Sequence, residues 1–192
     1  ERRTGNTLIF IRFLHPAVGI WKFLVGERIP GESRFHMWLP VRGMISDDTY
    51  FLEPSPEYTV TSPGDAADAM TVTAYQYRDN SLYVQASRGY NTENVVKPDF
   101  AAPGVDILTA SIGAGAEFAP ATGTSLAAAQ TAGMAALLFE WSLIRENEPY
   151  FTGNSVKNYL SRGAVRDLNL PYPNQEWGYG RLDLYHTFEL LT

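Results

Sequence analysis

The sequence contains no cysteine and few basic residues. The absence of cysteine excludes disulfide scaffolds, thiolate nucleophiles and cysteine-based zinc sites, and it leaves the cellular compartment open. The chain has 15 Lys and Arg residues against 21 Asp and Glu residues, for a formal net charge of -6. Because no cluster of Lys and Arg is present to bind phosphates, we expect no nucleic acid among the partners.

Long apolar runs are also missing from the sequence. The longest weakly polar stretch, Leu126 to Phe139, is interrupted by Gln130 and Thr131, whereas a membrane-spanning helix needs about 20 apolar residues. We therefore expect no membrane partner. The first six residues contain neither an initiator Met nor the apolar block of a signal peptide, so we expect that Glu1 is not the start of the gene.

The composition that is present is sufficient for a packed core, since 45% of the 192 residues are hydrophobic. In residues 1–58, short runs rich in β-branched and aromatic side chains predict strands at Leu8–Phe13, Gly19–Val25 and Phe35–Val41. The third run alternates with a period of two, as in a strand with one face on a core. We interpret residues 1–58 as a β-rich segment and place a boundary near Thr59.

In residues 59–192, predicted strands alternate with predicted helices, which favours an α/β fold. The strands are Met70–Tyr75 and Val105–Ala110; the helices are Thr124–Trp141, one capped by Asn154 or Ser155 and ending at Gly163, and Leu182–Leu191. The second helix has an apolar stripe and the last closes the chain.

The segment that points to chemistry is Gly123-Thr124-Ser125 at the start of the Ala-rich helix. A Ser at a helix start lies where free backbone N–H groups and the positive end of the helix dipole meet, and this arrangement stabilises an oxyanion. A Ser or Thr in this place is also the ordinary helix N-cap. The local pattern leaves both interpretations open.

Several ordered motifs resemble those of subtilisin-like serine proteases (subtilases). Residues Gly123 to Ala128 resemble Gly-Thr-Ser-Met-Ala, and Lys97 to Gly104 resemble Lys-Pro-Asp-x-x-Ala-Pro-Gly. Four further segments resemble motifs of the same family, and these are Ser62-Pro63-Gly64, Thr71-Val72-Thr73-Ala74, Ser87-Arg88-Gly89 and Gly178-Tyr179-Gly180-Arg181-Leu182-Asp183. The resemblance covers residues 59–192.

The resemblance implies the C-terminal half of a subtilisin-like parallel-sheet domain, with Ser125 as the nucleophile and with Thr124 and Gly123 shaping the oxyanion wall. It implies a peptide or protein substrate, no cofactor and no metal. Phrases such as Trp38-Leu39-Pro40 and Trp177-Gly178-Tyr179-Gly180 are similar to the clostridial Csp-like subtilases of spore germination. That narrower resemblance implies an inserted jelly roll that includes residues 1–58, and an extracytoplasmic or spore-associated location.

The partners of a catalytic Ser are missing from the expected places. In subtilases the order is Asp, His, Ser, yet only His15 and His36 precede Ser125, and neither stands in a family motif. The Asn that donates to the oxyanion is missing too, because Asn6 lacks the family's Ala-Gly-Asn setting. We therefore expect the C-terminal part of a protease that is inactive alone, that pairs with the missing N-terminal part of the same protein and that can self-associate. The alternative is a catalytically inactive pseudoprotease that acts as a binding or regulatory partner.

Three other hypotheses follow from single features. Ser125, Asp183 and His186 follow the order of α/β-hydrolase triads, although Asp183 and His186 lie on one helix, where solvent-facing charge is expected. Aromatic residues could bind a sugar, but packing is the expected role; they are Trp21, Trp38, Tyr50 and Phe51. Acidic pairs could bind calcium, but they lack its loop spacing and are expected to be turn and cap carboxylates; they are Asp47/Asp48 and Asp65/Asp68.

Overall fold

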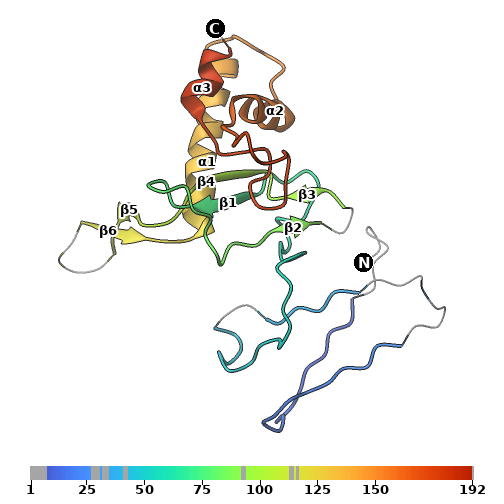
Figure 1. The fold of residues 1–192 in the computed structure, drawn as a ribbon. Coiled ribbons are helices and arrows are strands. Elements are labelled where there is room, and N and C mark those ends of the chain that lie inside the picture. Colours follow the sequence, from blue (N-terminus) through green and yellow to red (C-terminus); the bar gives the residue numbers. More distant parts are fainter. Residues whose placement is uncertain are drawn as a thin grey trace. The chain divides into compact units, whose positions relative to one another are not determined.

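The computed structural model describes residues 8–26, 31, 35–40, 43–91, 94–112, 115 and 117–191. The chain divides into two compact units, residues 1–38 and residues 39–192. Each unit is described by itself below (Figure 1).

The described residues of the first unit form no helix and no strand. None of these residues belongs to a hydrogen-bonded strand, so the strands expected at Leu8–Phe13, Gly19–Val25 and Phe35–Val41 are not formed; Val41 lies outside the described residues. The alternation of side chains predicts which of them share a face, but a strand also needs a neighbouring backbone to accept its hydrogen bonds.

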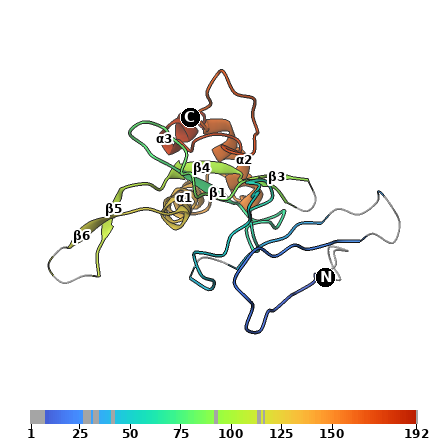
Figure 2. The same cartoon turned by 60° about the horizontal axis from the view of Figure 1, so that its bottom comes forward.

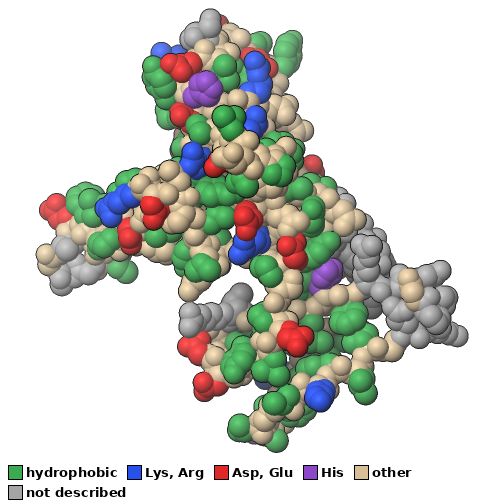
Figure 3. Space-filling model, in the orientation of Figure 1, with side chains coloured by type: hydrophobic (Ala, Val, Ile, Leu, Met, Phe, Trp, Pro, Cys, Tyr) green, Lys and Arg blue, Asp and Glu red, His purple; other side chains and the backbone are tan. Residues whose placement is uncertain are grey.

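Aromatic and aliphatic side chains of the first unit lie at its surface (Figure 3). Phe13 packs against Trp21 and Phe23, with ring centroids 5.0 and 6.0 Å apart. Trp21 and Trp38 are nevertheless each 50% exposed, so the burial expected for these two aromatic residues is not observed.

The second unit contains all of the described helices and strands. The strands are β1 (Val72–Tyr75), β2 (Gly89–Tyr90), β3 (Val96–Lys97), β4 (Phe100–Pro103), β5 (Ile107–Ala110) and β6 (Phe118–Ala121). The helices are α1 (Thr124–Phe139), which continues into a π-helical turn (Glu140–Ile144), α2 (Gly153–Gly163) and α3 (Leu184–Glu189). All six described strands precede the described helices along the chain, so the predicted alternation of strand and helix is wrong.

The centre of this unit is the parallel pair β1–β4, in which Val72 lies opposite Phe100 and Ala74 opposite Ala102. Helix α1 packs against both strands, while α2 and α3 pack against each other (Figures 1 and 2). Ala74, Ala102 and Ala127 are fully buried, because these small side chains let α1 approach the strands closely. The parallel arrangement confirms the predicted α/β fold.

Strands β5 and β6 form an antiparallel hairpin that projects away from the β1–β4 pair (Figures 1 and 2). Leu108, Ile112 and Phe118 of this hairpin are 69%, 109% and 59% exposed. The hairpin thus presents large apolar side chains that the described residues do not cover.

The ends of the two shorter helices differ from the prediction. Helix α2 is capped by Thr152, whose hydroxyl accepts from the Ser155 N–H while the Ser155 hydroxyl accepts from the Thr152 N–H. This reciprocal capping box moves the start of α2 ahead of the predicted Asn154 or Ser155. Helix α3 is shorter than predicted, because Asp183 stands outside it as the N-cap.

Helix α1 and the π-helical turn together form a helical stretch, Thr124–Ile144, of 21 residues. By length and composition alone, this stretch could cross a membrane. It extends the predicted helix Thr124–Trp141 by three residues, because the π-helical turn continues past Phe139 without interruption. Helices that pack in a protein core can have the same length and composition, and α1 packs on β1 and β4.

Candidate active site

The N-terminus of α1 is formed by Gly123, which has extended dihedrals (φ 164°, ψ 155°) and no side chain to cap the helix. The hydroxyl of Ser125 accepts or donates no hydrogen bond among the described residues, and the Ser125 side chain is exposed. The alternative interpretation of this segment as a Ser or Thr N-cap is therefore wrong. The Ser125 hydroxyl does not cap the helix.

Gly123 is attached to the central strands by its backbone. Its N–H donates to the Gly104 carbonyl at 2.8 Å, and the Gly104 N–H donates to the Tyr75 carbonyl at 3.0 Å. A Cβ at Gly104 would lie 2.6 Å from the Ala74 Cβ and 2.8 Å from the Gly123 carbonyl oxygen. Only glycine allows this approach, so the Ala-Pro-Gly motif fixes the turn that carries Ser125 to the ends of β1 and β4.

Two backbone N–H groups at the start of α1 find no acceptor in the part of the chain that the structure describes. The Leu126 N–H donates to the Gly123 carbonyl at 3.1 Å, whereas the Thr124 and Ser125 N–H groups have no acceptor among the described residues. The first turn of this 16-residue helix contains no acidic residue. The positive end of the helix dipole and two free donors therefore lie beside the Ser125 hydroxyl.

A cavity of about 350 Å³ opens beside Ser125. Its lining consists mainly of small and apolar groups from two segments, and these are Pro63, Gly64, Ala69, Met70, Thr71 and Val72 on one side and Thr124, Ser125 and Ala128 on the other. The cavity is largely open to the surface. The lining contains no His, Asp or Glu, so the described cavity provides no base for the Ser125 proton.

The two upstream histidines belong to the first unit. His15 lies at a bend with a positive φ of 54°, which agrees with its expected role as a turn residue, and both His15 and His36 are exposed. Asn6 lies outside the described residues.

The α/β-hydrolase alternative does not fit the positions of Asp183 and His186. The Asp183 carboxylate accepts from the His186 N–H at 2.9 Å as the cap of α3, and the His186 Nδ1 lies 3.4 Å from the Glu189 carboxylate. Neither Asp183 nor His186 lines the cavity at Ser125. The two residues form a helix cap rather than part of a triad.

Gln130 of α1 has a structural role that the sequence did not reveal. Its side-chain Nε2 donates to the Pro103 carbonyl at 2.9 Å and so ties α1 to the end of β4. This hydrogen bond helps to hold α1, and with it the turn that carries Ser125, against β4.

Asp65 is a turn carboxylate, as expected. Its Oδ1 accepts from the Ser62 hydroxyl at 2.8 Å. Within the described ranges, no group of three or more His, Asp or Glu side chains could hold a metal ion.

A sequence model of the subtilase family matches residues 48–180. The chain belongs to the subtilase family. The predicted resemblance is thereby confirmed, and the subtilase motifs at Lys97–Gly104 and Gly123–Ala128 lie together at the site described above. A comparison with curated protein sequences finds no match.

Solved subtilase structures are similar to this chain. The CspB protease of Clostridium perfringens shares 41% sequence identity with this chain, and the two structures superpose with a TM-score of 0.69. The match covers 74% of this chain and 31% of the CspB chain. The patellamide maturation protease PatA is 28% identical with a TM-score of 0.53, over 67% of this chain and 45% of PatA. The prenylagaramide maturation protease PagA is 26% identical with a TM-score of 0.53, over 68% of this chain and 45% of PagA. The chain thus spans less than half the length of these relatives.

Proposed function

We propose that this chain supplies the nucleophile of a subtilisin-like serine endopeptidase. The observation that carries the proposal is the position of Ser125. Its exposed hydroxyl makes no capping hydrogen bond, and Ser125 lines a cavity of about 350 Å³ at the N-terminus of α1. An activated Ser needs such a field of donors where negative charge develops in the transition state. The similarity to CspB supports the same assignment.

In the proposed reaction, the Ser125 Oγ attacks the carbonyl carbon of the substrate's peptide bond and forms a C–O bond. The hydroxyl proton passes to a base and then to the leaving amine, so that the C–N bond breaks and an acyl-enzyme remains. The Ser125 N–H donates to the oxyanion, and Thr124 and Gly123 shape the wall beside it. Water then hydrolyses the acyl-enzyme and regenerates the Ser125 hydroxyl.

The base and its orienting carboxylate come, in this proposal, from the N-terminal part of the same protein. Helix α1 exposes a stripe of small residues that suits close packing by such a part, and its members are Ala128, Ala129, Ala132, Gly133 and Ala136. At Gly133, an added Cβ would meet no described atom within 4 Å. We expect the separate chain to be inactive and to self-associate through exposed apolar groups such as those of the β5–β6 hairpin.

The proposal extends to the Csp-like type, with residues 1–58 as part of an inserted jelly roll and with an extracytoplasmic or spore-associated role in germination. The second candidate is a pseudoprotease that binds a partner without cleaving it. The contact between Gln130 and Pro103 does not favour that candidate, because it preserves the support of α1. A whole-protein sequence without the upstream family Asp or His would favour it.

The test is hydrolysis of peptides by the whole protein, with Ser125→Ala as the matched variant. We expect wild-type cleavage and a loss of about 10⁴-fold or more in kcat for Ser125→Ala, because the nucleophile is removed while oxyanion binding remains. Ser125→Ala cleaving at the wild-type rate would contradict the proposal. A wild-type protein that binds peptides without cleaving them would favour the pseudoprotease.

A further inference from the structure

One side of the cavity at Ser125 is formed by residues 63–72, here called the cavity wall. This segment contributes Pro63, Gly64, Ala69, Met70, Thr71 and Val72 to the lining and leads directly into β1. It contains no helix or strand before Val72. Its own backbone closes turns through the Ala66 and Ala69 N–H groups, and further hydrogen bonds from elsewhere in the fold hold these turns in place.

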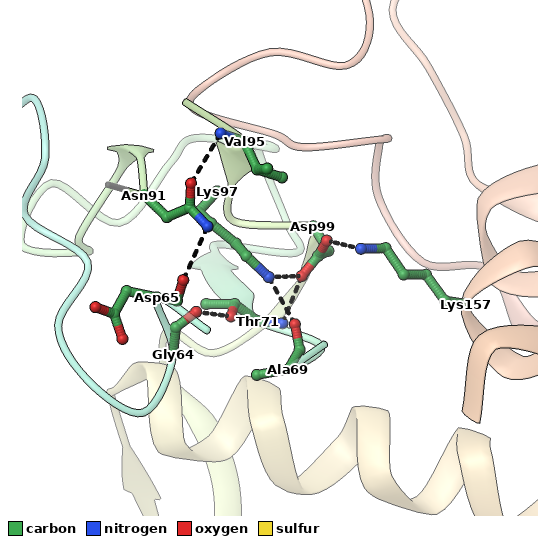
Figure 4. Close-up of polar contacts among 9 residues, drawn as sticks. All are labelled: Gly64, Asp65, Ala69, Thr71, Asn91, Val95, Lys97, Asp99 and Lys157. Atoms are coloured by element: carbon green, nitrogen blue, oxygen red, sulfur yellow. Dashed lines mark hydrogen bonds and ion pairs between the residues drawn. The ribbon is translucent and has the colours of Figure 1, made fainter. Parts of the chain in front are cut away.

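A buried ion pair provides those hydrogen bonds. The side chains of Lys97 and Asp99 are 0% and 1% exposed, and the Lys97 Nζ lies 2.9 Å from the Asp99 Oδ2. The Lys97 ammonium also donates to the Ala69 carbonyl at 2.6 Å, and the Asp99 Oδ2 also accepts from the Thr71 N–H at 2.8 Å. Each charged group therefore makes, besides the ion pair, one hydrogen bond to the backbone of the cavity wall (Figure 4).

Two other contacts support the same wall. The Thr71 hydroxyl donates to the Gly64 carbonyl, and the Asn91 Nδ2 donates to the Asp65 carbonyl at 3.0 Å (Figure 4). Asn91 is itself held, since its Oδ1 accepts from the Val95 N–H at 2.8 Å. The wall is thus tied along its length to the segment that precedes β4.

A buried ion pair is costly in desolvation, and well-packed apolar residues can match or exceed its contribution to stability. An apolar pair could not, however, bind one backbone carbonyl and one backbone N–H of the wall at fixed positions. We propose that Lys97 and Asp99 are positioning residues that keep the cavity wall in the shape that receives a substrate side chain beside Ser125. This inference rests on the proposed function.

Lys157 of α2 offers a matched control. Its ammonium forms an ion pair with the other carboxylate oxygen of Asp99, Oδ1, and its side chain is 28% exposed (Figure 4). Lys157 does not line the cavity. Removing Lys157 therefore perturbs the same carboxylate without removing a contact to the wall.

The experiment compares two reagents for Ser125 in the whole protein. One is a small alkyl fluorophosphonate, which places no side chain in the cavity, and the other is a peptidyl phosphonate with an apolar side chain next to the reactive group. For Lys97→Met we expect the inactivation rate with the peptidyl reagent to fall about 10–100-fold, because a displaced wall misplaces that side chain. The fluorophosphonate rate should stay within about threefold of the wild-type rate, as should both rates for Lys157→Met.

Equal losses with both reagents, or an unchanged peptidyl rate, in Lys97→Met would overturn the positioning role. If Lys97→Met does not fold, Thr71→Val decides. This milder variant removes only the hydroxyl contact to Gly64 and should lower the ratio of peptidyl to fluorophosphonate rates by about 3–10-fold. An unchanged ratio would overturn the inference.

Failure of the proposed function gives a different result, namely a wild-type protein that reacts with neither reagent. The positioning role is then measured by amide hydrogen exchange at residues 69–72. Lys97→Met, or Thr71→Val in its place, should exchange about 10-fold faster there than Lys157→Met, because wall contacts are lost only in the first two. Equal exchange in these variants would overturn the inference.

Discussion

The backbone N–H of Gly123 donates to the carbonyl of Gly104 at 2.8 Å, so the residue that begins the nucleophile helix is joined to the end of β4. The contact links two motifs that are separated in sequence by the β5–β6 hairpin. It also explains the glycine at position 104, since a Cβ there would lie 2.8 Å from the Gly123 carbonyl oxygen.

The first prediction concerns Gly104→Ala. The new methyl group would overlap the Ala74 Cβ and the Gly123 carbonyl oxygen, so we expect a loss of about 1–3 kcal/mol in the free energy of unfolding and slower reaction of Ser125 with a fluorophosphonate. Chemical denaturation and labelling kinetics of the whole protein measure these effects. Gly153→Ala is the control, because a Cβ there meets no described atom within 4 Å. Gly104→Ala with the stability and reactivity of the control would contradict the packing described.

The second prediction tests whether another part of the protein covers α1. Gly133→Ala would stabilise an uncovered helix by about 1 kcal/mol, since Ala has the higher helix propensity. If the N-terminal part packs on the small-residue stripe, the same change should instead destabilise the whole protein by about 1–3 kcal/mol through overpacking. Thermal unfolding of the whole protein gives the sign. A stabilised Gly133→Ala protein would contradict the proposed packing.

A third prediction separates the subtilase site from a hydrolase triad. Asp183→Ala should reduce stability by about 1 kcal/mol, because the cap of α3 is lost, and should leave Ser125 labelling within about twofold. His186→Ala should change neither property appreciably. Loss of Ser125 labelling in both variants would instead support an α/β-hydrolase triad of Ser125, Asp183 and His186.

The fourth prediction concerns pH. The Tyr159 hydroxyl donates to the Glu148 carboxylate at 2.7 Å, and this hydrogen bond to a negative charge raises the pKa of Tyr159 above its ordinary value of 10.0. A raised folded-state pKa means that the contribution to stability is present below pH 10 and is lost as the pH rises through the folded-state pKa. Tyr159→Phe should therefore be less stable than wild type at neutral pH, by about 1 kcal/mol or less given its partial exposure.

The difference between wild type and Tyr159→Phe should then shrink above pH 10, which unfolding curves across the alkaline range would record. Tyr150→Phe is the control, because Tyr150 is 90% exposed. A difference that persists unchanged through the alkaline range would assign the effect to packing and contradict the hydrogen-bond explanation.

Much of the second unit was predictable because its signals are local. The start of α1 at Thr124, the end of α2 at Gly163 and the parallel α/β character follow from turn residues, periodicity and motif order. The N-cap of α2 at Thr152 was missed because Ser155 also takes part in the capping box, so the sequence offered two polar candidates and only the backbone distinguishes them.

The site was predictable in part. The Gly-Thr-Ser motif identifies Ser125, but the free hydroxyl and the cavity depend on contacts between distant segments. The sequence identified Lys97 and Asp99 only as members of a family motif. Their hydrogen bonds to Ala69 and Thr71 span 28 residues of sequence. Such contacts have no periodic pattern that a single sequence could reveal.

The most direct test of the account is to locate the residue that a fluorophosphonate modifies in the whole protein. The protein is incubated with the reagent, digested and analysed by peptide mass spectrometry, with Ser125→Ala alongside. We predict a single phosphonylated residue, Ser125, and no adduct in Ser125→Ala. An adduct on another residue, or none in the wild-type protein, would contradict the assignment of Ser125 as the nucleophile.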